Sequence, residues 1–237
     1  MIKEFFMECV AIDGVAGAGK TTVAKLLAEK LGWYYLNSGS LYRTFAFKCL
    51  QMNVDINDTE SVKKCADKIE IDVVFDKKTG AQTIFVNKEQ VDFNKLAEPN
   101  VEFATTIVAQ VEKVRNKLTE IQRHIASNFK VVMEGRDVGT VVIPNSKYKF
   151  FLIASMSERV KRVKKRQKSA GIKNISTEQI EKDLQARDER DMKRKISPLK
   201  KADDAILVDS SNMPAEKVAE KMYKIIKDYN AELDNIK

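Results

Sequence analysis

Hydrophobic and polar positions alternate along the chain in the way that short buried strands and amphipathic helices do. Residues 8–13 form an apolar run typical of a strand, and residues 20–31 carry an apolar residue every three or four positions, as a helix does. The pattern predicts further strands at 33–36, 130–133, 147–153 and 205–208, and further helices at 40–52, 101–128, 157–169, 177–195 and 214–231. Strands that alternate with helices predict a parallel sheet covered on both faces.

Residues 70–92 break this alternation. They read as two alternating strands on either side of a turn at residues 76–80. That is the pattern of a hairpin, and a hairpin cannot join a parallel sheet through a crossover. We therefore expect a small antiparallel insertion that projects from the main domain.

Composition is that of an ordinary globular protein. The 237 residues are 43% hydrophobic and 32% charged, and they suffice for one well-buried domain with an insertion. No apolar run approaches the roughly 18 to 20 residues of a membrane span, and charges interrupt residues 1–10 where a signal peptide would be apolar. We expect no membrane partner and a cytoplasmic location. The spacing of Cys9, Cys49 and Cys65 fits neither a disulfide framework nor a metal site, so we expect reduced, mostly buried thiols.

The net charge of +8 is concentrated in one segment. Residues 157–200 hold 15 lysines and arginines against 7 acidic residues, an excess equal to that of the whole chain. Such a segment either faces an anionic ligand or binds nucleic acid non-specifically. It contains no aromatic residue that could stack on single-stranded bases. We therefore expect no nucleic-acid partner, and a nucleic-acid-binding ATPase is the alternative from another functional class.

The strongest chemical signal is a glycine-rich loop between the first predicted strand and the first predicted helix. It reads G-x-x-x-x-G-K-T, a phosphate loop in which backbone N–H groups at a helix N-terminus point onto phosphate oxygens. Lys20 is placed to bridge the β- and γ-phosphates, and Thr21 to offer its hydroxyl to Mg²⁺. The residues of this predicted nucleoside triphosphate site are Gly14, Val15, Ala16, Gly17, Ala18, Gly19, Lys20, Thr21 and Thr22.

Two further polar clusters fall where an anion could bind. Residues 134–137, Glu-Gly-Arg-Asp, follow a predicted strand and so lie at the sheet edge where ligands bind in open α/β folds. A simple loop ion pair of Arg136 is the alternative there. Arg187, Asp191 and Arg194 share one helix face, as either an anion clamp or a solvent-exposed set of salt bridges. A lid of arginines over a transferred phosphate explains both their spacing and the local charge.

Five segments in this order resemble the bacterial cytidylate kinases, which transfer the γ-phosphoryl group of ATP to CMP or dCMP. They are AIDGVAGAGKTTVAKLLAEKLGW, residues 35–43 (YLNSGSLYR), VVMEGRDVGTVVIPNSKYKFFL, ARDERDMKRKISPL and ADDAILVDSS. The resemblance implies an α/β fold of the P-loop NTPase type over residues 1–237, a three-layer sandwich with a five-stranded parallel sheet. It also implies that residues 66–98 form the monophosphate-binding subdomain and residues 157–176 a short helical lid. We expect ATP as the phosphoryl donor, Mg²⁺ as the cofactor and the small molecules CMP and dCMP as acceptors. We also expect the protein to be a monomer.

The resemblance assigns roles to residues at matching positions. Arg43, Arg136 and Arg194 correspond to residues that hold the acceptor phosphate, and Arg187 and Asp191 to residues near the ribose. Ser38 and Tyr42 also belong to the implied acceptor pocket. The residues implied around the base are Thr106, Arg115 and Asp137. The cations expected to neutralise the transferred phosphoryl group are Lys20, Arg136, Arg187 and Arg194.

The implied base pocket has a physical consequence for the choice of acceptor. The exocyclic amine of cytosine can donate to a carboxylate such as Asp137, whereas uracil presents a carbonyl oxygen at that place. An unpaired buried polar contact costs about 1 to 3 kcal/mol, so we expect CMP to be preferred over UMP. One departure is Asn37, which stands where these kinases usually have Asp. Another P-loop kinase, acting on UMP, AMP or a hydroxyl metabolite, is the nearest alternative.

Overall fold

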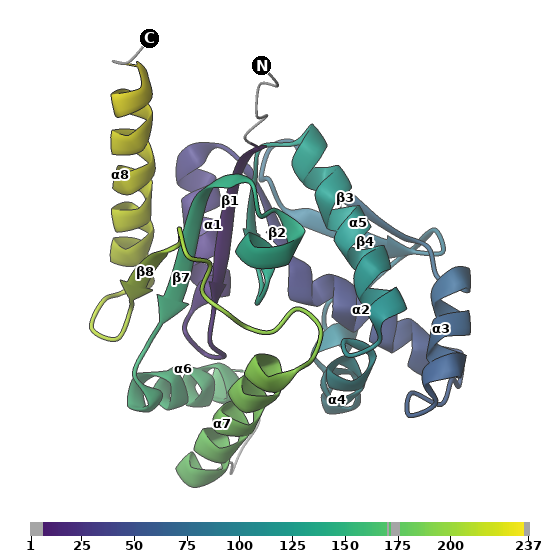
Figure 1. The fold of residues 1–237 in the computed structure, drawn as a ribbon. Helices are drawn as coiled ribbons and strands as arrows, with labels where there is room; N and C mark the ends of the chain where they lie inside the picture. The colour runs from purple at the N-terminus through teal and green to yellow at the C-terminus, as the bar shows by residue number, and fades with distance from the viewer. Residues whose placement is uncertain (1–6, 170, 172–175, 235–237) are drawn as a thin grey trace.

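The candidate functional site lies at the carboxyl ends of the strands of the main sheet. The structure is a computed structural model that describes residues 7–169, 171 and 176–234. Five parallel strands lie in the order β2-β6-β1-β7-β8 (Figure 1). Their bounds are β1 Met7–Gly14, β2 Tyr34–Asn37, β6 Val131–Glu134, β7 Ser146–Ile153 and β8 Ile206–Asp209. The predicted five-stranded parallel sheet is confirmed.

Helices cover both faces of this sheet because the side chains of its central strand alternate. Val10 and Ile12 of β1 pack in one apolar core with helices α1 (Lys20–Leu31) and α8 (Ala215–Asp234). Cys9 and Ala11 face the opposite way, into a core with α5 (Glu112–Asn128) and a π-helical turn (Val138–Val142). The period of two along a strand thus produces a three-layer sandwich. All three cysteines are free and buried, as expected.

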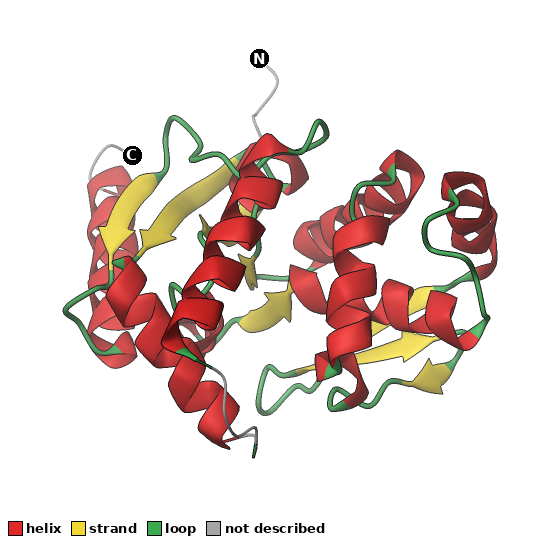
Figure 2. Cartoon of the chain, turned by 90° about the horizontal axis from the view of Figure 1, so that it is seen from below, coloured by secondary structure: helices red, strands yellow, loops and turns green. Residues whose placement is uncertain are grey.

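The predicted antiparallel insertion is confirmed and contains one strand more than expected. Strands β3 (Ile71–Phe75) and β4 (Gln82–Val86) pair antiparallel, and the short β5 (Glu89–Gln90) pairs with β4. The connecting turn forms because the Asp76 side chain accepts backbone N–H bonds from Lys78 and Thr79. This sheet stands beside the main sheet (Figure 2). It shares a core with helices α2 (Ser38–Gln51), α3 (Thr59–Lys68), α4 (Pro99–Val108) and α5, and the 3₁₀ turn Lys95–Ala97.

The prediction of a single long helix over residues 101–128 is wrong, because the helical structure is interrupted between α4 and α5. Val111 is extended and lies at the start of α5. The carbonyl of Ala109, which a continuous helix would offer to a backbone N–H four residues on, accepts a bond from the Arg115 side chain at 3.0 Å. Val108 and Val114 remain buried in one core on either side of the break, so the apolar period does not reveal it.

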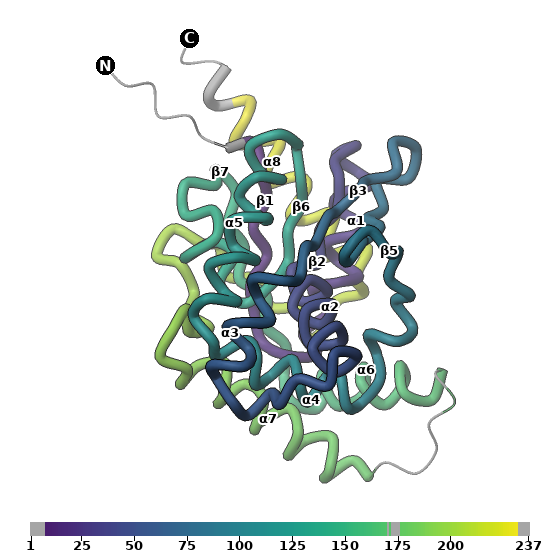
Figure 3. The backbone as a smooth tube through the Cα atoms, turned by 90° about the vertical axis from the view of Figure 1, so that its right-hand side faces the viewer, coloured from purple at the N-terminus to yellow at the C-terminus, as the bar shows by residue number. Residues whose placement is uncertain are grey.

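Helices α6 (Met156–Ser169) and α7 (Thr177–Lys193) lie together below the main sheet (Figure 3). Val160 of α6 and Ile180 and Leu184 of α7 bury Ala16 of the glycine-rich loop between them. The expected lid range 157–176 includes residues 170 and 172–175, which lie outside the described residues. Among the described helices, none has the length and apolar character needed to cross a membrane.

Candidate active site

A cavity of about 790 Å³ opens where the carboxyl ends of β1 and β6 meet α2, α4 and α7. It brings together sixteen of the predicted site residues from both halves of the chain. They are Ala16, Gly17, Gly19, Lys20, Thr21, Thr22, Ser38, Tyr42, Arg43, Thr106, Arg115, Arg136, Asp137, Arg187, Asp191 and Arg194. The cavity lining does not include Gly14, Val15 and Ala18, which belong to the loop on the side away from the cavity.

Two glycines give the loop between β1 and α1 its course. A β-carbon on Gly14 would lie 2.0 Å from the carbonyl oxygen of Leu152 in the neighbouring strand β7, so only glycine fits there. Gly19 has a φ of +93° directly before α1, in the left-handed region that favours glycine. The loop can therefore turn tightly and present the N-terminus of α1 to the cavity.

Lys20 is the buried cation of this loop. Its Nζ donates to the carbonyl oxygens of Gly14 at 2.7 Å and Val15 at 2.8 Å. Burial, with repulsion from Arg136, lowers the pKa of the Lys20 ammonium well below its usual range. An anion that entered beside Lys20 would relieve this cost, as a triphosphate chain would.

Glu134 lines the cavity, although the sequence analysis named it only within the 134–137 cluster and gave it no role of its own. Its Oε1 accepts a hydrogen bond from the Thr21 hydroxyl at 2.7 Å and one from Tyr35 at 3.1 Å. A buried carboxylate and a hydroxyl oxygen thus meet at the start of α1. Oxygen ligands of this kind suit Mg²⁺, which is usually held by one or two protein groups together with substrate phosphates. The available signal was its position as the last residue of a strand beside β1.

Asp13 positions the loop that carries Arg136 and Asp137. Its two carboxylate oxygens accept backbone N–H bonds from Val138 at 2.9 Å and Gly139 at 2.7 Å. Burial raises the pKa of Asp13 to about 6 although both hydrogen bonds act to lower it. A charged residue inside an otherwise apolar strand was the sequence signal for this role.

A buried charge network lies on the acceptor side of the cavity. Asp137 accepts from Arg115 at 2.6 Å and from Arg194 at 3.3 Å. The Arg115 guanidinium also lies over the Tyr42 ring, 5.2 Å from its centroid. Only 3% of the Arg115 side chain is exposed, so Asp137 compensates a fully buried charge.

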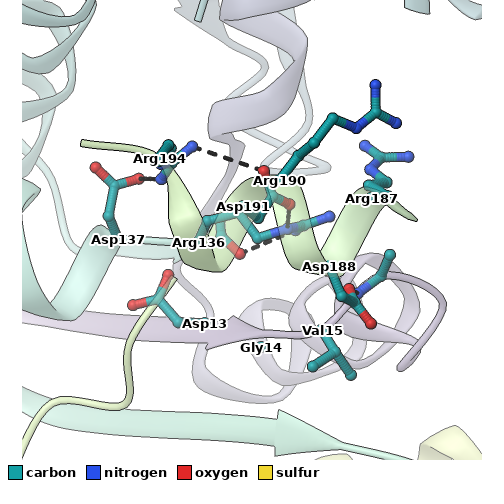
Figure 4. A network of polar contacts seen from close by, with 12 residues as sticks. Asp13, Gly14, Val15, Arg136, Asp137, Arg187, Asp188, Arg190, Asp191 and Arg194 are labelled. Carbon is teal, nitrogen blue, oxygen red and sulfur yellow. Dashed lines mark hydrogen bonds and ion pairs between the residues drawn. The ribbon is translucent and has the colours of Figure 1, made fainter. Parts of the chain in front are cut away.

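Helix α7 extends this network toward the loop after β6 (Figure 4). Arg136 donates from Nε to Asp191 at 2.8 Å, and Arg194 lies 3.8 Å from the same carboxylate. Burial raises the pKa of Asp191, but Arg136 and Arg194 more than offset this, and the net effect is a lowering. Arg136 therefore forms an ion pair, with a carboxylate on α7 instead of one in its own loop, and it also lines the cavity.

Two buried residues that the sequence analysis did not single out hold the glycine-rich loop on the side away from the cavity. Asp188 of α7 accepts the backbone N–H of Ala16 at 2.9 Å, and Arg159 of α6 donates to the Ala16 carbonyl at 2.7 Å. Arg159 and Asp188 are also ion-paired and buried. The two residues are far apart in sequence, and nothing in their local pattern pairs them.

The hydroxyls expected in the acceptor pocket are held by the backbone. Ser38 donates to the carbonyl of Glu134 at 2.7 Å, and Thr106 donates to the carbonyl of Phe103 at 2.8 Å. Asn37, the departure noted in the sequence, caps α2 by accepting the N–H of Ser40 at 3.1 Å. Asn and Asp serve equally as N-caps, so this substitution preserves the helix start.

The sequence comparisons with known proteins agree on one family. The sequence profile of the cytidylate kinases matches residues 10–228. The chain is 39% identical over 224 residues to a cytidylate kinase of Limosilactobacillus reuteri (strain DSM 20016), covering 94% of this chain and 97% of that one. It is 40% identical over 223 residues to that of Thermosipho melanesiensis, covering 94% and 98%. An uncharacterized protein from Eubacterium ventriosum shares the fold, with a TM-score of 0.50 at 15% identity over 93% and 98% of the two chains.

Proposed function

The chain belongs to the cytidylate kinase family of phosphotransferases, and on this premise we propose that its cavity binds ATP with Mg²⁺ beside CMP or dCMP. The γ-phosphoryl group then passes from ATP to the acceptor phosphate, giving ADP and CDP or dCDP. The glycine-rich loop and Lys20 form the donor side. Arg43, Arg136 and Arg194 form the acceptor side, with Arg187 and Asp191 toward the ribose.

One observation carries this proposal. A single cavity holds a phosphate loop and, facing it, a set of arginines contributed by three other segments of the chain. A site that only hydrolysed a triphosphate would need the loop and a water-positioning group, whereas a second phosphate needs its own cations. The facing arginines are Arg43, Arg136, Arg187 and Arg194.

The reaction requires positioning and charge neutralisation more than proton transfer. The acceptor phosphate is already anionic and nucleophilic, so the protein does not have to supply a general base. Arg136 and Arg194, each fixed by a carboxylate, can hold the acceptor oxygen in line with the γ-phosphorus. Lys20 lies at the donor end of the same cavity and neutralises charge there. Thr21, with Glu134 behind it, would hold Mg²⁺, which would supply charge neutralisation at the donor phosphates.

The Asp137 network is suited to recognise cytosine. A carboxylate has about four lone-pair sites, so Asp137 can pair with Arg115 and Arg194 and still accept from an exocyclic amine. The Nε of Arg115 is buried and has no hydrogen-bond partner among the described residues, which leaves a donor for a base acceptor atom. These groups support the proposed preference for CMP over UMP.

Glu134→Gln is expected to weaken the apparent Mg²⁺ affinity of the enzyme about 10- to 100-fold, the usual effect of removing a group that orients a metal ligand. The amide keeps the shape of the side chain and can still accept from Thr21, but it carries no charge. Turnover titrated with Mg²⁺ at fixed ATP measures the effect. The Glu134→Asp variant, which retains the charge, should recover part of it, and an unchanged Mg²⁺ dependence in Glu134→Gln would remove Glu134 from the metal site.

The proposal is tested by ADP release from ATP and Mg²⁺ with CMP, dCMP, UMP, AMP or no acceptor. We expect turnover to depend on CMP or dCMP and to be at least about tenfold less efficient with UMP. Equal ADP release without an acceptor would instead indicate an ATPase, for which the basic α6–α7 region should be tested against nucleic acid by salt-dependent gel shift. Preference for another acceptor would retain the kinase and reject the base pocket.

A further inference from the structure

One carboxylate in the cavity region belongs to none of the networks described above. Glu102 of α4 accepts a hydrogen bond from Nη1 of Arg187 in α7 at 2.7 Å. The same oxygen lies 3.7 Å from Nη2 of Arg43 in α2. Two arginines from different helices, both on the acceptor side of the proposed site, therefore converge on one side-chain anion.

These two arginines have no other ion-pair partner in the part of the chain that the structure describes. Arg136 and Arg194 differ from them, because Asp191 and Asp137 fix those two guanidinium groups in place. Burial and then repulsion from Arg136 lower the pKa of Arg187, so a neighbouring anion stabilises its charged form. Glu102 is such an anion.

Glu102 is held more loosely than the carboxylates of the fixed network. Its side chain is 45% exposed, against 9% for Asp137 and 21% for Asp191. Burial raises the pKa of Glu102, but the nearby arginines, Arg187 first, lower it by more, so its pKa lies below the usual value and the group is ionised near neutral pH. A partly exposed side chain on a helix can leave an ion pair for solvent at small cost.

We propose that Glu102 is an intramolecular competitor of the acceptor nucleotide. It occupies the guanidinium groups of Arg43, placed at the acceptor phosphate, and of Arg187, placed toward the ribose and the transferred phosphoryl group, until the acceptor displaces it. The inference rests on the proposed function, because it takes these arginines as acceptor ligands. Displacement has a consequence for specificity. A nucleotide adds base contacts to its phosphate contacts and can displace the carboxylate, whereas a small anion has only the phosphate contacts. Glu102 thus weakens the binding of every anion that uses these two arginines, and an anion without base contacts is left with little affinity.

The test is Glu102→Gln, which keeps the size of the side chain and removes its charge. We expect the KM for CMP to fall about three- to tenfold with kcat changed less than about twofold, as suits loss of two partly exposed ion pairs. The inhibition constant of inorganic phosphate against CMP should fall by at least as much. Glu220→Gln is the matched control, because Glu220 pairs with Lys30 at 2.6 Å and is 54% exposed, away from the cavity.

An unchanged or higher KM for CMP in Glu102→Gln would overturn the inference. A rise for CMP but not for dCMP would instead make Glu102 a ligand of the 2′-hydroxyl. Glu102→Ala, which cannot hydrogen bond to Arg187, separates loss of charge from a new amide contact and should show the same direction. If the wild-type protein shows no CMP-dependent turnover, the proposed function fails. Calorimetric binding of inorganic phosphate to both proteins still decides the inference, which requires tighter binding by Glu102→Gln.

Discussion

Replacing Lys20 with alanine is expected to abolish detectable phosphoryl transfer while the fold remains intact. Lys20 is buried in the loop that receives the donor phosphates, and its ammonium is the cation that the loop itself contributes. Loss of a preorganised group that stabilises charge in the transition state lowers kcat about 10²- to 10³-fold, and loss of donor binding adds to this. Initial rates of ADP release at saturating CMP measure the effect.

Lys30→Ala is the matched control for this variant. Lys30 lies in the last turn of the same helix α1 and pairs with Glu220 on the surface. Its loss should leave turnover unchanged and stability almost unchanged, because an exposed ion pair contributes little. Circular dichroism and thermal unfolding of Lys20→Ala establish that the fold is retained. Near-normal turnover in that folded variant would reject the phosphate-loop assignment.

Asp137→Asn is expected to have the second large effect, on both stability and acceptor choice. The substitution leaves the guanidinium of Arg115, with 3% of its side chain exposed, without a charged partner. Breaking one side of a buried ion pair destabilises a protein by about 3 to 5 kcal/mol, which urea unfolding detects directly. An amide can also donate toward the carbonyl of uracil, so the preference for CMP over UMP in kcat/KM should fall about tenfold or more.

Asp204→Asn provides the comparison for this result. Asp204 pairs with Lys149 at 2.7 Å, but its side chain is 65% exposed, so its loss should cost less than about 1 kcal/mol and leave acceptor choice unchanged. If Asp137→Asn lowers the unfolding free energy no more than Asp204→Asn does, the buried network is not a stabilising unit. If it retains the wild-type CMP/UMP ratio, Asp137 is not the group that recognises the base.

The parts of the fold that sequence could predict are those with strong local patterns. Short apolar runs define the strands, and the G-x-x-x-x-G-K-T loop joins β1 to α1 as its chemistry requires. The hairpin at residues 70–92 was recognisable because Asp76 and Gly80 supply turn chemistry between alternating strands. Helix α3 carries an equivalent local signal, an Asp58 N-cap before an apolar stripe, and it was still not predicted.

The structural features that could not be predicted from the sequence depend on contacts between residues far apart in the chain. The break between α4 and α5 forms where Arg115 takes the carbonyl of Ala109, and the apolar period continues through it. The Arg159–Asp188 pair joins α6, α7 and the glycine-rich loop only after folding. Glu102 in an amphipathic helix looks like any solvent-facing glutamate, and only the fold brings it to Arg43 and Arg187.

We propose that the γ-phosphoryl group of ATP is transferred to the phosphate of a cytidine nucleotide. This transfer is tested most directly by incubating the purified protein with γ-³²P-labelled ATP, Mg²⁺ and CMP and separating the labelled products. We expect label in CDP, formed in equal amount to ADP, with little free phosphate. Label that appears as inorganic phosphate at the same rate with or without CMP would contradict it.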